Sequence, residues 1–169
     1  MKIINNIIII ISLITTLLSK NILITLLLVP LLLISLFIRK HNLKLELVYL
    51  IFLFLAYVLG YGIDLYDRVY NYDSVVHFIF GFVSSIYAIP VFKYLNKRNT
   101  KLFKSIFIII FTLALAGLWE IIEFLIDIIF NSDMQRDLFD TMKDIICALI
   151  SSSIYSIVYN FSNNKNIDS

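Results

Sequence analysis

Long parts of this chain lack any charged residue, and this scarcity of charge is its most informative property. Only 15% of the 169 residues are Asp, Glu, Lys or Arg, whereas 60% are hydrophobic and the mean hydropathy is +0.92. A soluble domain of this length could not bury so much apolar surface, but a bilayer removes the need to bury it. The sequence therefore predicts an integral membrane protein whose main partner is the lipid bilayer.

Other scarcities exclude further classes of protein. The single cysteine, Cys147, has no partner for a disulfide within the chain. The net charge is only +2, so no basic surplus indicates a nucleic-acid partner. Lys2 is followed by an apolar run that ends at Leu18 without a small-residue cleavage site. This pattern is typical of a retained helix rather than of a cleaved signal peptide.

The uncharged runs, separated by short charged clusters, predict an all-α fold: a polytopic transmembrane bundle of about six helices. Most runs have the ~17–25 residues needed to cross the hydrocarbon core of a membrane. Only Lys20 and Asn21 separate the first two runs, so one long broken or re-entrant segment is the alternative there. We expect a single transmembrane domain over residues 1–169, with helices near 3–19, 21–38, 45–63, 74–94, 104–127 and 140–161.

Basic and acidic residues alternate between the predicted connections. The connections after the second and fourth helices are basic, with Arg39, Lys40 and Lys44 in one and Lys93, Lys97, Arg98, Lys101 and Lys104 in the other. The connections after the third and fifth helices are acidic, with Asp64, Asp67 and Asp73 in one and Asp127, Asp133, Asp137 and Asp140 in the other. Basic loops face the cytoplasm in multi-pass proteins. We therefore predict a cell-membrane protein with both termini cytoplasmic, which Lys2 and Lys165 support.

Several ionisable side chains fall within or beside the last three predicted helices. In the predicted topology they all lie in the outer half of the bundle. They are Asp73, His77, Glu120, Glu123, Asp140 and Asp144. Carboxylates at membrane depth cost roughly 2.5–3.5 kcal/mol each on insertion, so they normally face a bundle interior with a partner.

A divalent metal ion would be a suitable partner for closely packed carboxylates, which otherwise need shared protons or water between them. Oxygen ligands with one imidazole suit Zn, Mn, Fe or Mg, depending on geometry. The predicted metal ligands are His77, Glu120, Glu123, Asp140 and Asp144. Glu123 or Asp73 is the predicted general base, and Gly81 and Gly117 are expected to let helices approach closely.

Structural roles compete with this interpretation at some of these positions. Asp137, which we interpret as a helix cap, stands where acidic residues cap a helix N-terminus and complement its dipole, and the same role is an alternative for Asp140 and Asp73. Asp140 and Asp144 could also form ordinary ion pairs with Lys143. A lone imidazole such as His77 is often only hydrogen-bonded to a neighbour. For Glu120 and Glu123 the structural interpretation is weaker, because no basic residue is nearby in that helix.

Three segments together resemble the YjdF-like family of uncharacterised multi-pass membrane proteins. They are Tyr72-Asp73-x-x-x-His77-Phe78-x-x-Gly81-Phe82, Trp119-Glu120-x-x-Glu123-Phe124 and Gln135-x-x-x-x-Asp140-Thr141-x-x-Asp144. The resemblance covers roughly residues 45–155 and implies the same six candidate site residues. Family members often carry Gly after the Gln, where this chain has Arg136. One branch also has His and Glu near residues 56–60, where this chain has neither.

Three functions remain open from the sequence alone. The first is a metal-dependent hydrolase that acts on a lipid or lipid-linked substrate near the outer leaflet, with a metal-bound water as nucleophile. The second is a proton- or cation-coupled transporter in which the carboxylates titrate. The third is a non-catalytic membrane scaffold in which the polar cluster locks helices together. Bound metal, coupled flux and stability changes, respectively, would distinguish them.

Overall fold

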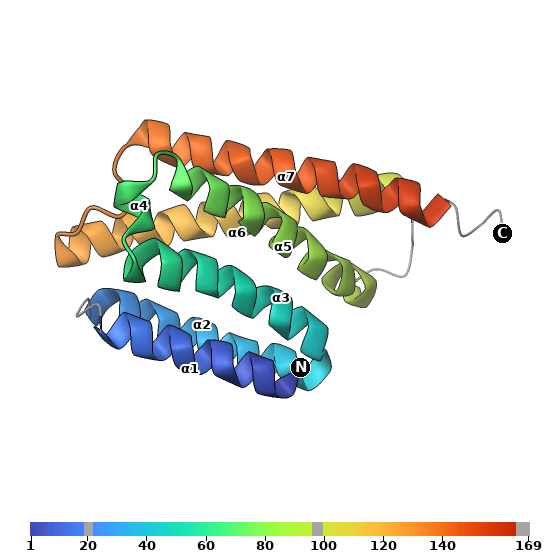
Figure 1. The fold of residues 1–169 in the computed structure, drawn as a ribbon. Coiled ribbons are helices and arrows are strands. Elements are labelled where there is room, and N and C mark those ends of the chain that lie inside the picture. The colour runs from blue at the N-terminus through green and yellow to red at the C-terminus, as the bar shows by residue number, and fades with distance from the viewer. Residues whose placement is uncertain (19–21, 96–99, 165–169) are drawn as a thin grey trace. The chain divides into compact units, whose positions relative to one another are not determined.

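The computed structural model describes residues 1–18, 22–95 and 100–164, and every regular element in them is a helix. In chain order these elements are α1 (Lys2–Leu18), α2 (Ile22–His41), α3 (Leu43–Leu53), the π-helix η1 (Phe54–Gly62), α4 (Leu65–Arg68), α5 (Tyr72–Leu95), α6 (Lys101–Phe130) and α7 (Leu138–Asn164) (Figure 1). Within this described part, five helices are long and apolar enough to cross a membrane, with α3 and η1 counted as one. The apolar α1 is shorter, at 17 residues. The predicted all-α fold is confirmed.

The observed boundaries follow the predicted runs closely, with two additions. The last part of the predicted helix near 45–63 is wound as the π-helix η1, and the short helix α4 follows it. Where the sequence left one broken segment as an alternative, the structure has two helices, α1 and α2, which pack against each other. The residues between them, including Lys20 and Asn21, lie outside the described part, as do Lys97, Arg98 and Lys165.

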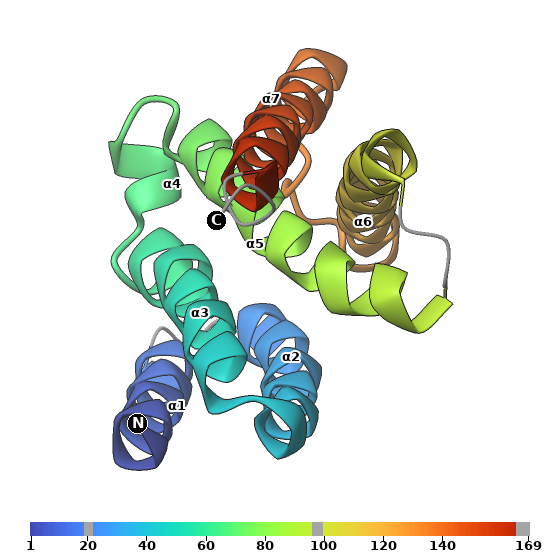
Figure 2. The same ribbon diagram turned by 90° about the vertical axis from the view of Figure 1, so that its right-hand side faces the viewer.

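Close contacts divide the chain into two compact units. The N-terminal unit spans Met1–Val76, and the C-terminal unit spans His77–Ser169. In the N-terminal unit α1, α2 and α3 stand side by side, and η1 continues α3 along α1 (Figure 2). In the C-terminal unit α6 and α7 run side by side in opposite directions (Figure 1). The single domain over residues 1–169 and the cytoplasmic termini stay predictions.

On two helices, α1 and α6, buried polar side chains stand opposite exposed apolar ones. On α1, Asn5, Ser12 and Thr16 are fully buried, whereas Ile10 and Ile14 are more than half exposed. The same inversion recurs on α6, which buries Thr112, Glu120 and Glu123 and exposes Ile110, Ile121 and Leu125. Water would make such an exterior unfavourable, whereas lipid tails are as apolar as leucine. The distribution of side chains therefore fits a lipid environment.

The connection from η1 to α5 is held by a row of tyrosine rings in the N-terminal unit. The ring centroids of Tyr61 and Tyr66 are 4.6 Å apart, and those of Tyr66 and Tyr72 are 5.4 Å apart. The hydroxyl of Tyr72 donates to the carbonyl of Leu55 at 2.9 Å. The ring of Tyr66 lies directly against Gly60, where an added Cβ would be 2.2 Å from the ring edge. These contacts fix the first turn of α5, which carries Asp73.

Candidate functional site

The candidate site is assembled by the three helices of the C-terminal unit. His77 lies in the second turn of α5, the two glutamates lie on α6, and the two aspartates open α7. None of the five predicted metal ligands is more than 8% exposed; they are His77, Glu120, Glu123, Asp140 and Asp144. The buried faces of α5, α6 and α7 therefore all carry ionisable groups. Their roles as metal ligands stay predictions.

A close approach of α5 and α7 brings His77 to Asp144. A Cβ added at Gly81 would lie 1.8 Å from Oγ of Ser151 and 2.7 Å from the carbonyl oxygen of Ala148, so only glycine fits there. Gly81 follows His77 by one turn, and Ala148 follows Asp144 by one turn. The missing side chain thus sets the spacing of the two helices beside the site. The expectation for Gly117 is wrong, because it faces open space, with nothing within 4 Å of an added Cβ.

The imidazole of His77 is the centre of a small group of potential metal-binding atoms. A ring nitrogen of His77 and a carboxylate oxygen of Asp144 lie within 4.8 Å of one another. Asp73 precedes His77 by four residues on α5, and its carboxylate lies within the same 4.8 Å of the ring nitrogen. Residues four apart share one helix face, so this second approach follows directly from the sequence.

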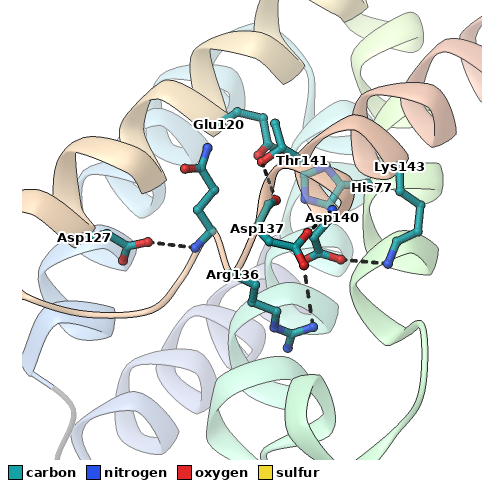
Figure 3. Close-up of polar contacts among 9 residues, drawn as sticks. His77, Glu120, Asp127, Arg136, Asp137, Asp140, Thr141 and Lys143 are labelled. Atoms are coloured by element: carbon teal, nitrogen blue, oxygen red, sulfur yellow. Dashed lines mark hydrogen bonds and ion pairs between the residues drawn. The ribbon is translucent and has the colours of Figure 1, made fainter.

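Glu120 lies on the Nδ1 side of His77. Its Oε1 is 3.9 Å from Nδ1 of the imidazole, and both side chains are more than nine-tenths buried. Figure 3 shows the two side chains meeting between α6 and α5, near the start of α7. A carboxylate beside one ring nitrogen is the arrangement that orients metal-binding histidines through the other nitrogen. At 3.9 Å the contact is not a hydrogen bond, so Glu120 would have to move closer before it could orient the imidazole.

Glu123 is held by its own helix. The indole Nε1 of Trp119 donates to Oε1 of Glu123 at 2.8 Å, across one turn of α6. This hydrogen bond was not predicted from the sequence. A charge-assisted hydrogen bond fixes the direction of a buried carboxylate. Glu123 is thus a rigidly placed group on the helix that also carries Glu120.

Asp140 carries ion pairs of its own. The ammonium of Lys143 is 2.7 Å from its Oδ1, and Nη1 of Arg136 is 3.9 Å from its Oδ2 (Figure 3). The ordinary ion pair with Lys143 that the sequence offered as an alternative is therefore present. Two cations beside one carboxylate offset its charge without a metal ion.

The loop between α6 and α7 is organised by two aspartates. Asp127 accepts hydrogen bonds from the hydroxyl of Ser132 at 2.7 Å and from the backbone N–H groups of Met134 and Gln135 at 2.8 and 2.9 Å (Figure 3). Asp137 accepts from the backbone N–H of Asp140 at 2.8 Å, which confirms it as the cap of α7. The carboxylate of Asp127, near the end of α6, therefore anchors this loop.

Arg136 adopts a left-handed backbone conformation with φ of 58°. This conformation favours glycine, the residue that the resembled family often carries here. We expect Arg136→Gly to be more stable than Arg136→Ala by about 1 kcal/mol, because both lose the contact with Asp140 and only glycine avoids the backbone strain. Thermal unfolding of the two variants in the same detergent measures the difference. Equal stabilities would contradict a strained backbone at this residue.

Sequence reasoning missed a second buried cluster, which lies in the N-terminal unit. Oε1 of Glu46 accepts a hydrogen bond from Nε of Arg39 and lies 2.7 Å from both Nε and Nη2. Its Oε2 accepts from the side-chain amide of Asn5 at 2.7 Å. Glu46 and Asn5 are both fully buried, so the cluster ties α1, α2 and α3 together. A glutamate at the start of an apolar run, seven residues after an arginine, was the available signal.

Comparison with known proteins agrees with these structural observations. Residues 2–165 match the family described as "Predicted membrane protein (DUF2238)", so the chain belongs to this family. No curated protein and no solved structure matches the chain. The family description carries no activity, and any function must therefore be argued from the residues of the site.

Proposed function

We propose that this chain is a multi-pass protein of the cell membrane and a metal-dependent hydrolase. The carrying observation is the buried approach of His77 and Asp144, whose potential ligand atoms lie within 4.8 Å of one another. Both side chains are more than nine-tenths buried on helices that are apolar enough to span a membrane. Ionisable groups at such positions usually mark a functional site.

One divalent metal ion would be held by Asp73, His77 and Asp144. Two carboxylates and one imidazole suit Zn, Mn or Fe, and three protein ligands leave positions open for water. Glu120 would orient the imidazole from the Nδ1 side, so that Nε2 faces the metal ion. This assignment gives Glu120 a positioning role in place of the ligand role that the sequence predicts. Asp140, paired with Lys143, would lie outside the set of ligands.

The bound ion would supply a hydroxide nucleophile at neutral pH by lowering the pKa of its water. Glu123 is the proposed general base, because Trp119 fixes its carboxylate on the face of α6 that carries Glu120. The surrounding apolar helices favour a lipid or lipid-linked substrate. The hydrolysed bond would be an ester or phosphate ester, since both are cleaved by metal-bound hydroxide without a covalent intermediate.

Elemental analysis of the detergent-purified protein tests the metal site. We expect one divalent ion per wild-type chain, and a loss of most of it in His77→Gln and Asp144→Asn. Glu120→Gln should bind the ion about 10–100-fold more weakly, as is typical when an orienting group is removed. Asp137→Asn is the matched control, because Asp137 caps α7 and should not affect metal content.

Hydrolysis is tested separately on metal-loaded protein with ester and phosphate-ester lipids. Glu123→Gln should keep the ion but lose turnover, since it removes only the proposed base. Folded wild type that takes up no Zn, Mn or Fe would refute the metal site. Bound metal without hydrolysis, but with cation flux into liposomes that Glu120→Gln abolishes, would favour a transporter.

A further inference from the structure

The C-terminal unit has a second end, opposite the candidate site, where three helices also pack together. There α5 ends, α6 begins and α7 approaches its end. The ring centroids of Phe92 on α5 and Phe103 on α6 are 5.8 Å apart. The side-chain amide of Asn160 on α7 donates to the hydroxyl of Ser105 on α6. These contacts bring the three helix ends together within one unit.

A lysine whose side chain is mostly buried lies at this end. Lys104, in the first turn of α6, is only 8% exposed, and its ammonium lies 5.3 Å from the ring centroid of Tyr159 on α7. An aromatic face attracts a cation but does not neutralise its charge. A buried ammonium is costly unless an anion accompanies it.

The sequence provides no carboxylate near this cation on any of the three helices. No Asp or Glu occurs in residues 81–119 or in residues 145–167, which include this end of α5, α6 and α7. Lys93, an exposed lysine in the last turn of α5, adds a second positive charge to this end of the unit. The positive end of the α6 dipole adds more, and the side chain of Thr100 makes no capping hydrogen bond to α6. Among the described residues of this end, no carboxylate is therefore available to pair with Lys104.

We propose that this end of the C-terminal unit binds the phosphate group of an anionic phospholipid. The ammonium of Lys104 and the backbone N–H groups of the first turn of α6 would hold the phosphate, as helix N-termini commonly do. Exposed Leu102 and Phe103 stand beside the cation and offer apolar surface for acyl chains. A lipid headgroup therefore fits better than free phosphate. The positive-inside rule places these basic residues at the leaflet where anionic lipids are enriched.

Nanodiscs of phosphatidylcholine, with and without added phosphatidylglycerol, test the proposal. We expect the wild type to retain phosphatidylglycerol preferentially in native mass spectrometry and to melt at a higher temperature when it is present. Lys104→Met should lower the affinity for this lipid about fivefold, the usual contribution of one basic residue near the membrane surface. Lys104→Arg should keep the preference. Lys44→Met, at an exposed lysine of the N-terminal unit, is the matched control and should also keep it.

The sign of the stability change separates lipid binding from a merely structural contact with Tyr159. In phosphatidylcholine alone, Lys104→Met should melt no lower than wild type, because it removes a mostly buried lysine that has no carboxylate partner among the described residues. A structural role instead predicts the same loss of melting temperature in both lipids, and this result would overturn the proposal. An absent preference for phosphatidylglycerol in the wild type would also overturn it. Inorganic phosphate that reproduces the full effect would exclude the lipid as the source.

Discussion

Arg39→Ala is expected to destabilise the N-terminal unit by about 3–5 kcal/mol, because it leaves a fully buried carboxylate without its counter-ion. Glu46 is 0% exposed, and Arg39 is the cation whose Nε and Nη2 both lie 2.7 Å from its Oε1. Asn5 would still donate to Oε2, but one neutral hydrogen bond does not balance a buried charge. Unfolding of the purified protein in a denaturing detergent titration measures the loss.

The control for this prediction is Lys40→Ala, one residue further along α2. Lys40 is exposed, so its removal should change stability by less than about 0.5 kcal/mol. The double variant Arg39→Met with Glu46→Met should recover most of the stability, because apolar residues of similar size often replace a buried pair without cost. An Arg39→Ala variant as stable as Lys40→Ala would show that the ion pair contributes nothing.

Gly81→Ala is expected to destabilise the C-terminal unit by about 1–3 kcal/mol, the usual cost of overfilling a packed interface. The new methyl group would meet Oγ of Ser151 at 1.8 Å and the carbonyl oxygen of Ala148 at 2.7 Å. Ser151 can rotate away, but the backbone carbonyl cannot move unless α5 and α7 separate. Separation would also pull His77 from Asp144, so metal content should fall together with thermal stability.

Gly117→Ala provides a matched control on α6. Nothing lies within 4 Å of a Cβ added at Gly117, so alanine should be neutral or stabilising by up to about 1 kcal/mol through its higher helix propensity. Combining Gly81→Ala with Ser151→Gly should restore only part of the stability, since the contact with Ala148 remains. Full recovery, or equal effects of the two alanine substitutions, would contradict the close approach of α5 and α7.

Much of the fold could be predicted because the uncharged runs are long and their ends are marked by charge. The start of α7 is an example: Asp137 ends the acidic loop, and its carboxylate caps the helix that begins at Leu138. The π-helix η1 could not be predicted, since Phe54–Gly62 has the same apolar composition as the α-helical turns before it. The turn into α4 depends on the left-handed backbone conformation of Asp64, and one acidic residue in the sequence does not predict this conformation.

The sequence predicted which residues belong to the candidate site better than it predicted which of them contact one another. Helical periodicity places Asp73 beside His77 and Glu120 near Glu123, because each pair is three or four residues apart. The approach of His77 to Asp144 depends instead on how closely α5 and α7 pack at Gly81. The spacing of residues within one helix does not predict the distance between two helices. The contact between Arg39 and Glu46 was not predicted for the same reason. The sequence places Arg39 in a basic connection and Glu46 at the start of the next helix, and it does not show that the two side chains meet.

The exposed isoleucines and leucines of α1 and α6 have a consequence for how this sequence can change over generations. A side chain that contacts lipid tails need only be apolar, so Ile, Leu, Val and Phe can replace one another there with little effect. The buried Ser, Thr and Asn residues must instead keep both their size and their hydrogen bonds. Exchange of one apolar residue for another should therefore be tolerated on the outer faces, and substitution of the buried polar residues should not. In a water-soluble helical protein the tolerant outer faces are polar and the intolerant inner ones are apolar, so the polarity of the two faces is what is reversed here.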